Sequence, residues 1–100
     1  MKRLFVDPYV IDTLLRDLAG HDRRASAYLV YLYLWRLTGG RRGERAGISL
    51  GRLAEETGLA KRTVQDAVTH LLRRRLLCVD RAAATAVPAY EVLRPWRRNA

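Results

Sequence analysis

The 100-residue sequence has a single cysteine, only two lysines and no long hydrophobic run. Because Cys78 has no second cysteine to pair with, the chain can form neither an internal disulfide nor a cysteine-based metal site, and a reducing cytoplasm is the simplest setting. The longest apolar run, Ala25 to Trp35, has 11 residues, well short of the roughly 20 that a membrane-spanning helix needs. The opening MKRLFVDPYV has too short an apolar run for a signal peptide. We therefore expect a cytoplasmic protein without a membrane span.

Residues that carry catalysis are also scarce. The chain has two Ser and two His, and it contains no Gly-x-Ser-x-Gly, no Gly-Lys-Ser phosphate loop and no His-Glu-x-x-His. Glu55 and Glu56 are adjacent, so they diverge on a helix and cannot act as a carboxylate pair. His21 and His70 are more readily explained as ordinary surface histidines than as ligands. We expect no enzymatic activity, no cofactor and no metal site.

The residue present in excess is arginine. Lys and Arg together number 19, of which 17 are Arg, against 10 Asp and Glu, and the formal net charge is +9. Both halves of the chain share the excess. Positive charge on this scale favours a polyanionic partner, either nucleic acid or an anionic membrane surface, although solubility alone can also explain it. Of the possible partners, we favour nucleic acid.

Two helices are predicted before the basic centre of the chain. Residues 8–19 follow the helix-start pair Asp7-Pro8, carry an apolar stripe at helical spacing, and should end at Gly20. Residues 23–38 are apolar on two sides when wound as a helix, so this helix should lie between two neighbours. Its second stripe is covered either by the rest of the fold or by a second copy of the chain, and a homodimer surface would then involve Ala27, Tyr31 and Leu34.

Residues 49–75 predict a short helix, a tight turn and a longer basic helix. Ser49 is a suitable N-cap because its hydroxyl can accept from the free N–H groups of the first turn. Gly58 supplies the left-handed residue that ends the first helix. Two helices joined by a Gly-containing turn, the second with a polar outer side, predict a helix-turn-helix. The inner side of the second helix should be formed by Val64, Ala67, Val68, Leu71 and Leu72.

Residues 76–93 predict a two-stranded hairpin, the wing of a winged helix-turn-helix, and residues 94–100 a basic tail that frays. The glycine-rich connection 39–47 should be a solvated basic loop, and Ile48 a short strand beside the hairpin. Pro88 should lie on an exposed edge, because it cannot donate a ladder hydrogen bond. The tip at 82–86 has little charge beyond Arg81, which argues against insertion into a minor groove. Trp96 either docks on the body or is available to a partner.

The run SLGRLAEETGLAKRTVQDAVTHLLRRRLL resembles the winged-helix family of bacterial and phage DNA-binding proteins, which includes transcription regulators and the DNA-binding modules of plasmid replication initiators. The resemblance covers about a third of the chain and implies a mostly α fold with a small β-hairpin, here one domain over 1–100 with an extra N-terminal helix. The matching positions are Ser49, Leu53-Ala54, Gly58, Thr63-Val64, Ala67-Val68, Leu71 and Leu76-Leu77.

Two positions depart from that family pattern. Ala60 stands where the family usually has a capping Ser or Thr, and losing such a cap costs about 0.5–2 kcal/mol. Arg75 stands where Gly commonly closes the second helix. A cation at a helix C-terminus is electrostatically favourable, but the exit geometry is left open.

The second helix carries the functional prediction. Its start, where free N–H groups also favour phosphate, is basic, and its outer side can meet base edges in a major groove: Arg reads guanine, Gln adenine, Asp cytosine and Thr the thymine methyl. Asp66 can read a base or pair with Arg62 or Arg73. Arg74 should touch backbone or solvent. The predicted DNA-binding residues are Lys61, Arg62, Thr63, Gln65, Asp66, Thr69, Arg73 and Arg81.

We therefore expect sequence-specific binding of double-stranded DNA, in transcription regulation or in replication and plasmid maintenance. The alternative is a winged helix used as a protein-docking module in a multi-subunit assembly, with its basic side against an acidic partner. RNA binding has less support, because Tyr90 is the only aromatic residue in the predicted strands.

Overall fold

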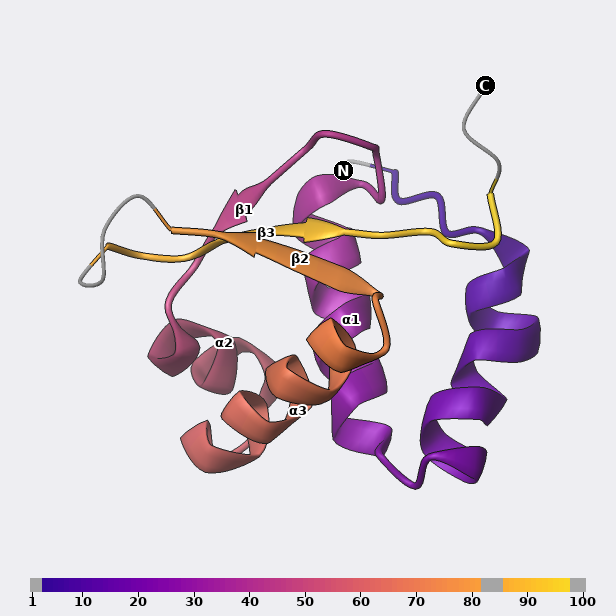
Figure 1. Cartoon of the computed structure of the whole chain (residues 1–100), viewed down its shortest axis with the longest axis horizontal. Helices are drawn as coiled ribbons and strands as arrows, with labels where there is room; N and C mark the ends of the chain where they lie inside the picture. The colour runs from indigo at the N-terminus through magenta and orange to yellow at the C-terminus, as the bar shows by residue number, and fades with distance from the viewer. Residues whose placement is uncertain (1–2, 82–85, 98–100) are drawn as a thin grey trace.

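The computed structural model describes residues 3–81 and 86–97. This part of the chain is mostly helical with a small three-stranded antiparallel sheet, so the predicted composition is confirmed at that level (Figure 1). Its elements in chain order are η1 (Val10–Leu14) and η2 (Arg16–His21), which together form an N-terminal helix, then α1 (Ala25–Thr38), β1 (Ala46–Gly47), α2 (Leu50–Thr57), α3 (Lys61–Arg73), β2 (Leu77–Asp80) and β3 (Ala89–Val92).

The N-terminal helix differs from the predicted α-helix in its winding. Both of its segments are π-helical, with i to i+5 hydrogen bonds such as the one from the Leu15 N–H to the Val10 carbonyl. The residues it buries are Val10, Leu14 and Leu18. They recur every four positions, which fits a winding wider than the about 3.6 residues per turn of an α-helix.

The predicted end of this helix at Gly20 is wrong. The helix continues through Gly20 to His21, because glycine in a right-handed conformation does not stop a helix. The chain turns instead at Arg23, whose positive φ of 56° breaks the helical path. Asp7 begins the helix through its carbonyl, which accepts from the Val10 N–H at 2.9 Å, while its side chain is used elsewhere.

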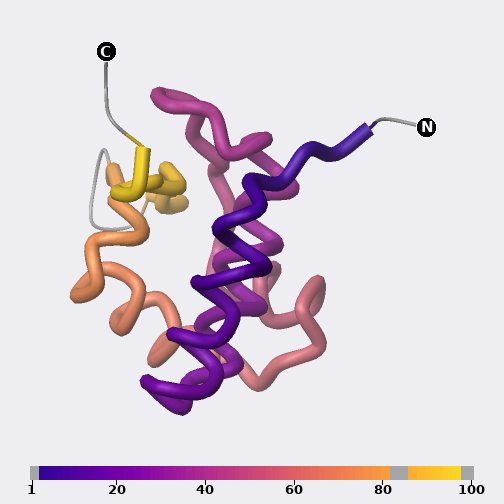
Figure 2. Tube along the Cα trace, turned by 90° about the vertical axis from the view of Figure 1, so that its right-hand side faces the viewer, coloured from indigo at the N-terminus to yellow at the C-terminus, as the bar shows by residue number. Residues whose placement is uncertain are grey.

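α1 is the central helix, with the N-terminal helix on one side, α2 and α3 on the other, and the sheet lying across it (Figures 1 and 2). Three of its aromatic side chains reach backbone carbonyls of other segments. Tyr28 donates to the N-terminal helix at 3.0 Å, Tyr31 to the segment after β3 at 2.9 Å, and Trp35 to the segment before the N-terminal helix at 2.9 Å. The polar atom of each of these three side chains is thereby satisfied.

The prediction of a homodimer surface on α1 is wrong, because the three residues assigned to that surface are buried. Ala27, Tyr31 and Leu34 are each 0% exposed. Contacts with the N-terminal helix, α3 and β3 cover the parts of α1 that carry these three residues. A second copy of the chain therefore cannot reach these side chains without opening the core.

α2 and α3 are joined by a short turn, as predicted. The Ser49 hydroxyl accepts from the Arg52 N–H at 3.1 Å and caps α2. Gly58 ends α2 with φ 74°, a conformation that residues with a Cβ rarely adopt. Leu59 is half-buried in the turn and packs against the core.

α3 ends in a Schellman arrangement with arginine in the place of glycine. The Leu76 N–H donates to the Leu71 carbonyl at 2.9 Å and the Arg75 N–H to the Leu72 carbonyl at 3.1 Å. Arg75 takes the left-handed conformation itself, with φ 57°. The exit that the sequence left open is therefore a left-handed turn at Arg75, a conformation that glycine adopts more readily.

The sheet has the strand order β1-β3-β2, so β3 is central. Tyr90 of β3 lies opposite Ala46 of β1 and Val79 of β2. The third strand forms at Ala46–Gly47, just before the predicted Ile48, and the Ile48 N–H still donates to the Pro88 carbonyl at 3.1 Å.

Pro88 is buried rather than on an exposed edge, because the chain at Ile48 covers it and uses its carbonyl as an acceptor. It precedes β3, so its missing N–H removes no ladder bond from that strand. Residues 82–85 of the predicted wing tip lie outside the described residues.

The described part of the C-terminal segment is docked on the N-terminal helix, so the predicted fraying is wrong for residues 94–97. The Trp96 ring stacks on Tyr9 with a centroid distance of 4.4 Å, and its Nε1 donates to Asp7 at 3.0 Å. Arg97 also donates to Asp7, at 2.9 Å. The Asp7 carboxylate thus joins the two ends of the described chain.

Candidate nucleic-acid interface

α3 has one buried and one solvent-facing side. Val64, Ala67, Val68 and Leu71 are buried at helical spacing, which seats the helix on α1 and α2. Ala60 stands at the N-cap with extended backbone and no side-chain cap, as predicted. The first N–H groups of α3 are therefore not satisfied by a capping side chain.

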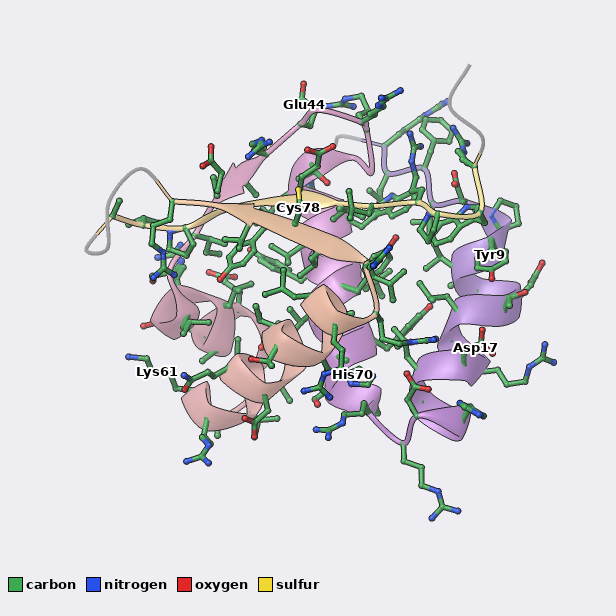
Figure 3. The ribbon with its side chains drawn as sticks, viewed as in Figure 1. Tyr9, Asp17, Glu44, Lys61, His70 and Cys78 are labelled. Carbon is green, nitrogen blue, oxygen red and sulfur yellow. The ribbon has the colours of Figure 1, made fainter. Side chains whose placement is uncertain are left out.

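The predicted DNA-binding residues are, with one exception, exposed. Thr63 is half-buried, since it lies at the margin between the two sides of α3. Figure 3 shows Lys61 extending away from the body at the start of the helix. The exposed members are Lys61, Arg62, Gln65, Asp66, Thr69 and Arg73 on α3, and Arg81 directly after β2.

Asp66 has the arginine pairing that the sequence left as one of two explanations. Its Oδ1 lies 3.8 Å from Nε of Arg62, and both side chains are mostly in solvent. A pair this long and this exposed contributes little energy. Arg62, with its side chain 86% exposed, can therefore leave Asp66 for another acceptor at small cost.

Lys61 and Arg81 come together although they are far apart in sequence. Both line a hollow of about 340 Å³ between the start of α2 and the segment before β3, together with Ser49 and Pro88. The predicted wing residue thus lies beside the basic start of α3. A polyanion that follows α3 would meet both cations.

At the other end of α3, the structure adds an arginine that sequence reasoning missed. Arg24, at the N-cap of α1, lines a hollow of about 240 Å³ with Asp66, Thr69 and Arg73. No sequence signal could have found it, because residues 24 and 73 meet only through the packing of α1 against α3. The exposed side of α3 is therefore flanked by a cation from another element at each end.

His70 and Arg74 have structural roles that the sequence did not predict. The Asp22 carboxylate accepts from His70 Nε2 at 2.8 Å and forms an ion pair with Arg74, whose Nε lies 3.0 Å away. His70 lies between α3 and the N-terminal helix rather than on the surface (Figure 3), and its Nδ1 is buried without a hydrogen-bond partner among the described residues. Arg74 is held by this ion pair instead of projecting freely.

The Asp22 carboxyl has a lowered pKa. Burial acts to raise the pKa, but hydrogen bonds from His21 and His70 and the charge of Arg74 outweigh it. The ionised carboxylate therefore stabilises the junction between the N-terminal helix and α3. This junction fixes the C-terminal half of α3 against the end of the N-terminal helix.

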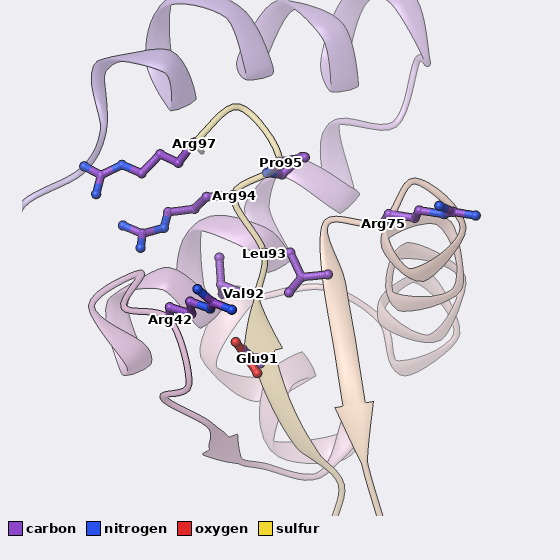
Figure 4. A pocket seen from close by; sticks show the side chains of 8 residues that line it. All are labelled: Arg42, Arg75, Glu91, Val92, Leu93, Arg94, Pro95 and Arg97. Carbon is purple, nitrogen blue, oxygen red and sulfur yellow. The ribbon is translucent and has the colours of Figure 1, made fainter. Parts of the chain in front are cut away.

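A second basic region lies at the end of β3. A cleft of about 400 Å³ is lined by Arg42, Arg75, Arg94 and Arg97 together with the Glu91 carboxylate. Figure 4 shows Arg42, Arg94 and Arg97 extending to one side of β3 and Arg75 to the other.

Two of these arginines, Arg94 and Arg97, are engaged within the fold. The Arg94 guanidinium lies 6.0 Å from the Trp35 ring centroid, and Arg97 pairs with Asp7. Glu91 accepts from the Gly43 N–H at 2.9 Å and lies 3.7 Å from Arg45, which fastens the basic loop to the sheet.

Other chemistry receives no support from the described residues. Within 3–81 and 86–97, no group of three or more His, Cys, Asp or Glu side chains is placed to hold a metal ion. No helix in that part of the chain is long and apolar enough to cross a membrane. Burial raises the pKa of the Cys78 thiol, and the Glu91 carboxylate beside it acts in the same direction, so this cysteine is a poor nucleophile at neutral pH.

Comparison with protein-family models, curated proteins and solved structures finds no match to this chain. Its candidate function therefore depends on the arrangement of its own residues.

Proposed function

We propose that this chain is a winged-helix protein that binds double-stranded DNA in a sequence-specific manner, with α3 as its reading helix. The observation that carries the proposal is the solvent-facing side of α3, where Arg62, Gln65 and Thr69 are exposed along one helix. Arginine, glutamine and threonine are side chains that distinguish base pairs in the major groove. A helix of this kind fits that groove.

The positions of the flanking cations support the same proposal. Lys61 and Arg81 lie beside the start of α3, and Arg24 lies near its end with Arg73. Contacts from such residues to phosphates position a reading helix without specifying sequence. The formal charge of +9 adds long-range attraction to a polyanion. Transcription regulation, or replication and plasmid maintenance, is the setting we propose for this binding.

The test is a selection of binding sites from randomised DNA duplexes, followed by mobility-shift titration of the selected duplex. We expect one enriched motif, and we expect affinity to fall with salt at a log–log slope of about −0.9 per neutralised phosphate. Binding that shows no enriched motif would restrict the proposal to non-specific DNA binding. Absence of any shift at low salt would overturn it and favour the protein-docking alternative.

A matched pair of variants locates the interface. Arg62→Ala should weaken binding to the selected duplex by about 1–3 kcal/mol, because a bidentate contact to guanine is lost. Arg41→Ala removes the same charge from the exposed loop after α1, and it should weaken binding less and equally for all sequences. Equal effects of the two substitutions on the selected duplex would argue against α3 as the reading helix.

A further inference from the structure

A second surface, on the outer side of α1, carries apolar side chains in solvent. Phe5 is 76% exposed, Leu29 45%, and Leu4 and Leu37 43% each. They line two hollows of about 340 and 390 Å³ that share Leu4 and Arg36 and so form one groove. Contiguous apolar surface of this kind is typical of interaction sites.

The groove is held in place by the fold. The Trp35 Nε1 donates to the Phe5 carbonyl at 2.9 Å, which fixes the backbone of the N-terminal segment against α1. Val6, the next residue, packs against the core. The Phe5 ring therefore projects from a fixed backbone, and a partner would not have to order this segment on binding.

The rim of the groove is cationic. Arg3 and Arg41 line its second hollow, and Arg36 lines both. Among the described residues that line the groove, the carboxylate is Glu56, which pairs with Arg52 at 3.1 Å. An occupant must therefore bring apolar side chains for the floor and negative charge for the rim.

We propose that this groove binds an acidic amphipathic segment of a partner protein, with its apolar side on Leu29, Leu37 and Phe5 and its carboxylates on the arginine rim. A segment with apolar residues at helical spacing is the usual ligand of such a groove. A second copy of this chain fits less well, because each copy carries a charge of +9 and would bring arginines against arginines. A bilayer surface is flat and fills a concave groove poorly. A ridge of side chains on a partner segment fills such a groove better.

This surface is independent of the proposed DNA interface. The exposed residues of α3 line neither of its hollows. The inference therefore does not depend on the proposed function, and DNA and partner can be bound together.

The test is a selection from a display library of random peptides, using the full chain as bait. The charge-matched variant Leu29→Ser/Leu37→Ser is the counter-selection bait, since it keeps every arginine and removes only the apolar floor. Both leucines lie outside the buried core, at 45% and 43% exposed, so the variant should still fold, which circular dichroism would check. We expect enrichment, on the wild type alone, of acidic peptides whose apolar residues recur at i, i+3 or i+4, and i+7.

The most enriched peptide, made synthetically, then separates the contributions of floor and rim. Its affinity should fall about tenfold or more in Leu29→Ser/Leu37→Ser and in Phe5→Ser, as expected for loss of apolar anchors. Arg36→Glu should weaken it too, and a peptide with one carboxylate changed to lysine should regain part of that loss. DNA binding should be unchanged in Leu29→Ser/Leu37→Ser and in Phe5→Ser, which keep every charge, whereas Arg36→Glu should weaken it slightly and equally for all sequences.

Three results would overturn the proposal. The first is equal enrichment on the charge-matched variant, which would mean that charge alone attracts the peptides. The second is sedimentation of the wild type as a dimer that the Leu29→Ser/Leu37→Ser variant loses, which would assign the groove to a second copy. The third is binding to phosphatidylglycerol vesicles that depends on Phe5 and Leu37 without any peptide binding, which would assign it to a membrane surface.

Discussion

The outer side of α3 and the cleft at the end of β3 are both rich in arginine, but they use it differently. In the cleft, Arg97 pairs with the Asp7 carboxylate at 2.9 Å, and that carboxylate is itself mostly buried. Arg94 lies over the Trp35 ring. On α3, the ion pair that Arg62 makes among the described residues is a long, exposed one with Asp66. Arginine therefore holds the fold together at Arg94 and Arg97 and remains available to a ligand at Arg62.

This difference means that a count of positive charges does not locate a binding surface. A guanidinium that already satisfies a buried carboxylate must break that pair to bind a phosphate, and the carboxylate is then left partly desolvated. An exposed guanidinium pays no such penalty. Pairing and burial, rather than charge density, separate the two regions.

The largest expected effect comes from removing two arginines from each of the two regions compared above, the outer side of α3 and the cleft at the end of β3. Arg62→Ala/Arg73→Ala should weaken binding to the selected duplex by about 1–3 kcal/mol per arginine, roughly 5- to 150-fold each in Kd. Arg42→Ala/Arg94→Ala removes the same charge from the cleft and should have a smaller effect that is uniform across sequences. Mobility-shift titration measures both variants. A larger loss from the cleft pair would move the interface there.

The next largest effect is expected on the free energy of unfolding. Asp7→Asn should destabilise the fold by about 1–3 kcal/mol, because asparagine keeps only one of the two acceptor oxygens used by Trp96 and Arg97 and has no charge to pair with Arg97. Urea unfolding measures this free energy. Affinity for the selected duplex should be unchanged below the unfolding transition. A concurrent loss of affinity would show that the docked C-terminal segment contributes to binding.

Stability should also depend on acid pH through Asp22. Its folded-state pKa is lowered, so its contribution is present above the unfolded pKa of about 4 and is lost as pH falls through the folded value. Asp22→Asn should lower stability by about 1–2 kcal/mol at neutral pH, since His70 and Arg74 lose an ionised acceptor. The difference between variant and wild type should shrink below about pH 4. Urea unfolding across this pH range measures it, and a constant difference would contradict the assignment.

The smallest effect is expected at Arg75, which lines the cleft but extends away from its other arginines (Figure 4). Its φ of 57° is unfavourable for a residue with a Cβ. Arg75→Gly should therefore stabilise the fold by about 0.5–1 kcal/mol, with relief of the left-handed strain partly offset by greater freedom of the unfolded chain. Thermal unfolding measures it, with Arg42→Gly in the same cleft as control. Equal shifts for both would rule out backbone strain as the cause.

Sequence reasoning succeeded where structure is local. Ser49 capped α2 and Gly58 ended it, because a cap and a left-handed turn each depend on a few adjacent residues. The buried side of α3 followed from helical spacing. The π-helical winding at the N-terminus was missed, since Val10, Ile11, Leu14, Leu15 and Leu18 satisfy an α-helical stripe as well as a wider one.

The candidate site was predictable in part for the same reason. The exposed residues of α3 share one helix, so their common side could be inferred from spacing. Arg24 could not be inferred, and neither could the use of His70 and Arg74 by Asp22, because these residues meet through contacts between elements. The apolar positions of α1 were recognised, but not which of them face solvent.

By itself, the sequence determined the mostly helical composition, the helix–turn–helix order of residues 49–75 and the polar side of α3, because these follow from interactions a few residues long. Tertiary structure alone decided that Ala27, Tyr31 and Leu34 are core rather than interface, and that Leu29 and Leu37 are left in solvent. On a helix that is apolar on two sides, spacing cannot choose which side is covered. That choice depends on where the N-terminal helix, α3 and the sheet pack. Their packing is determined by contacts between segments far apart in the chain.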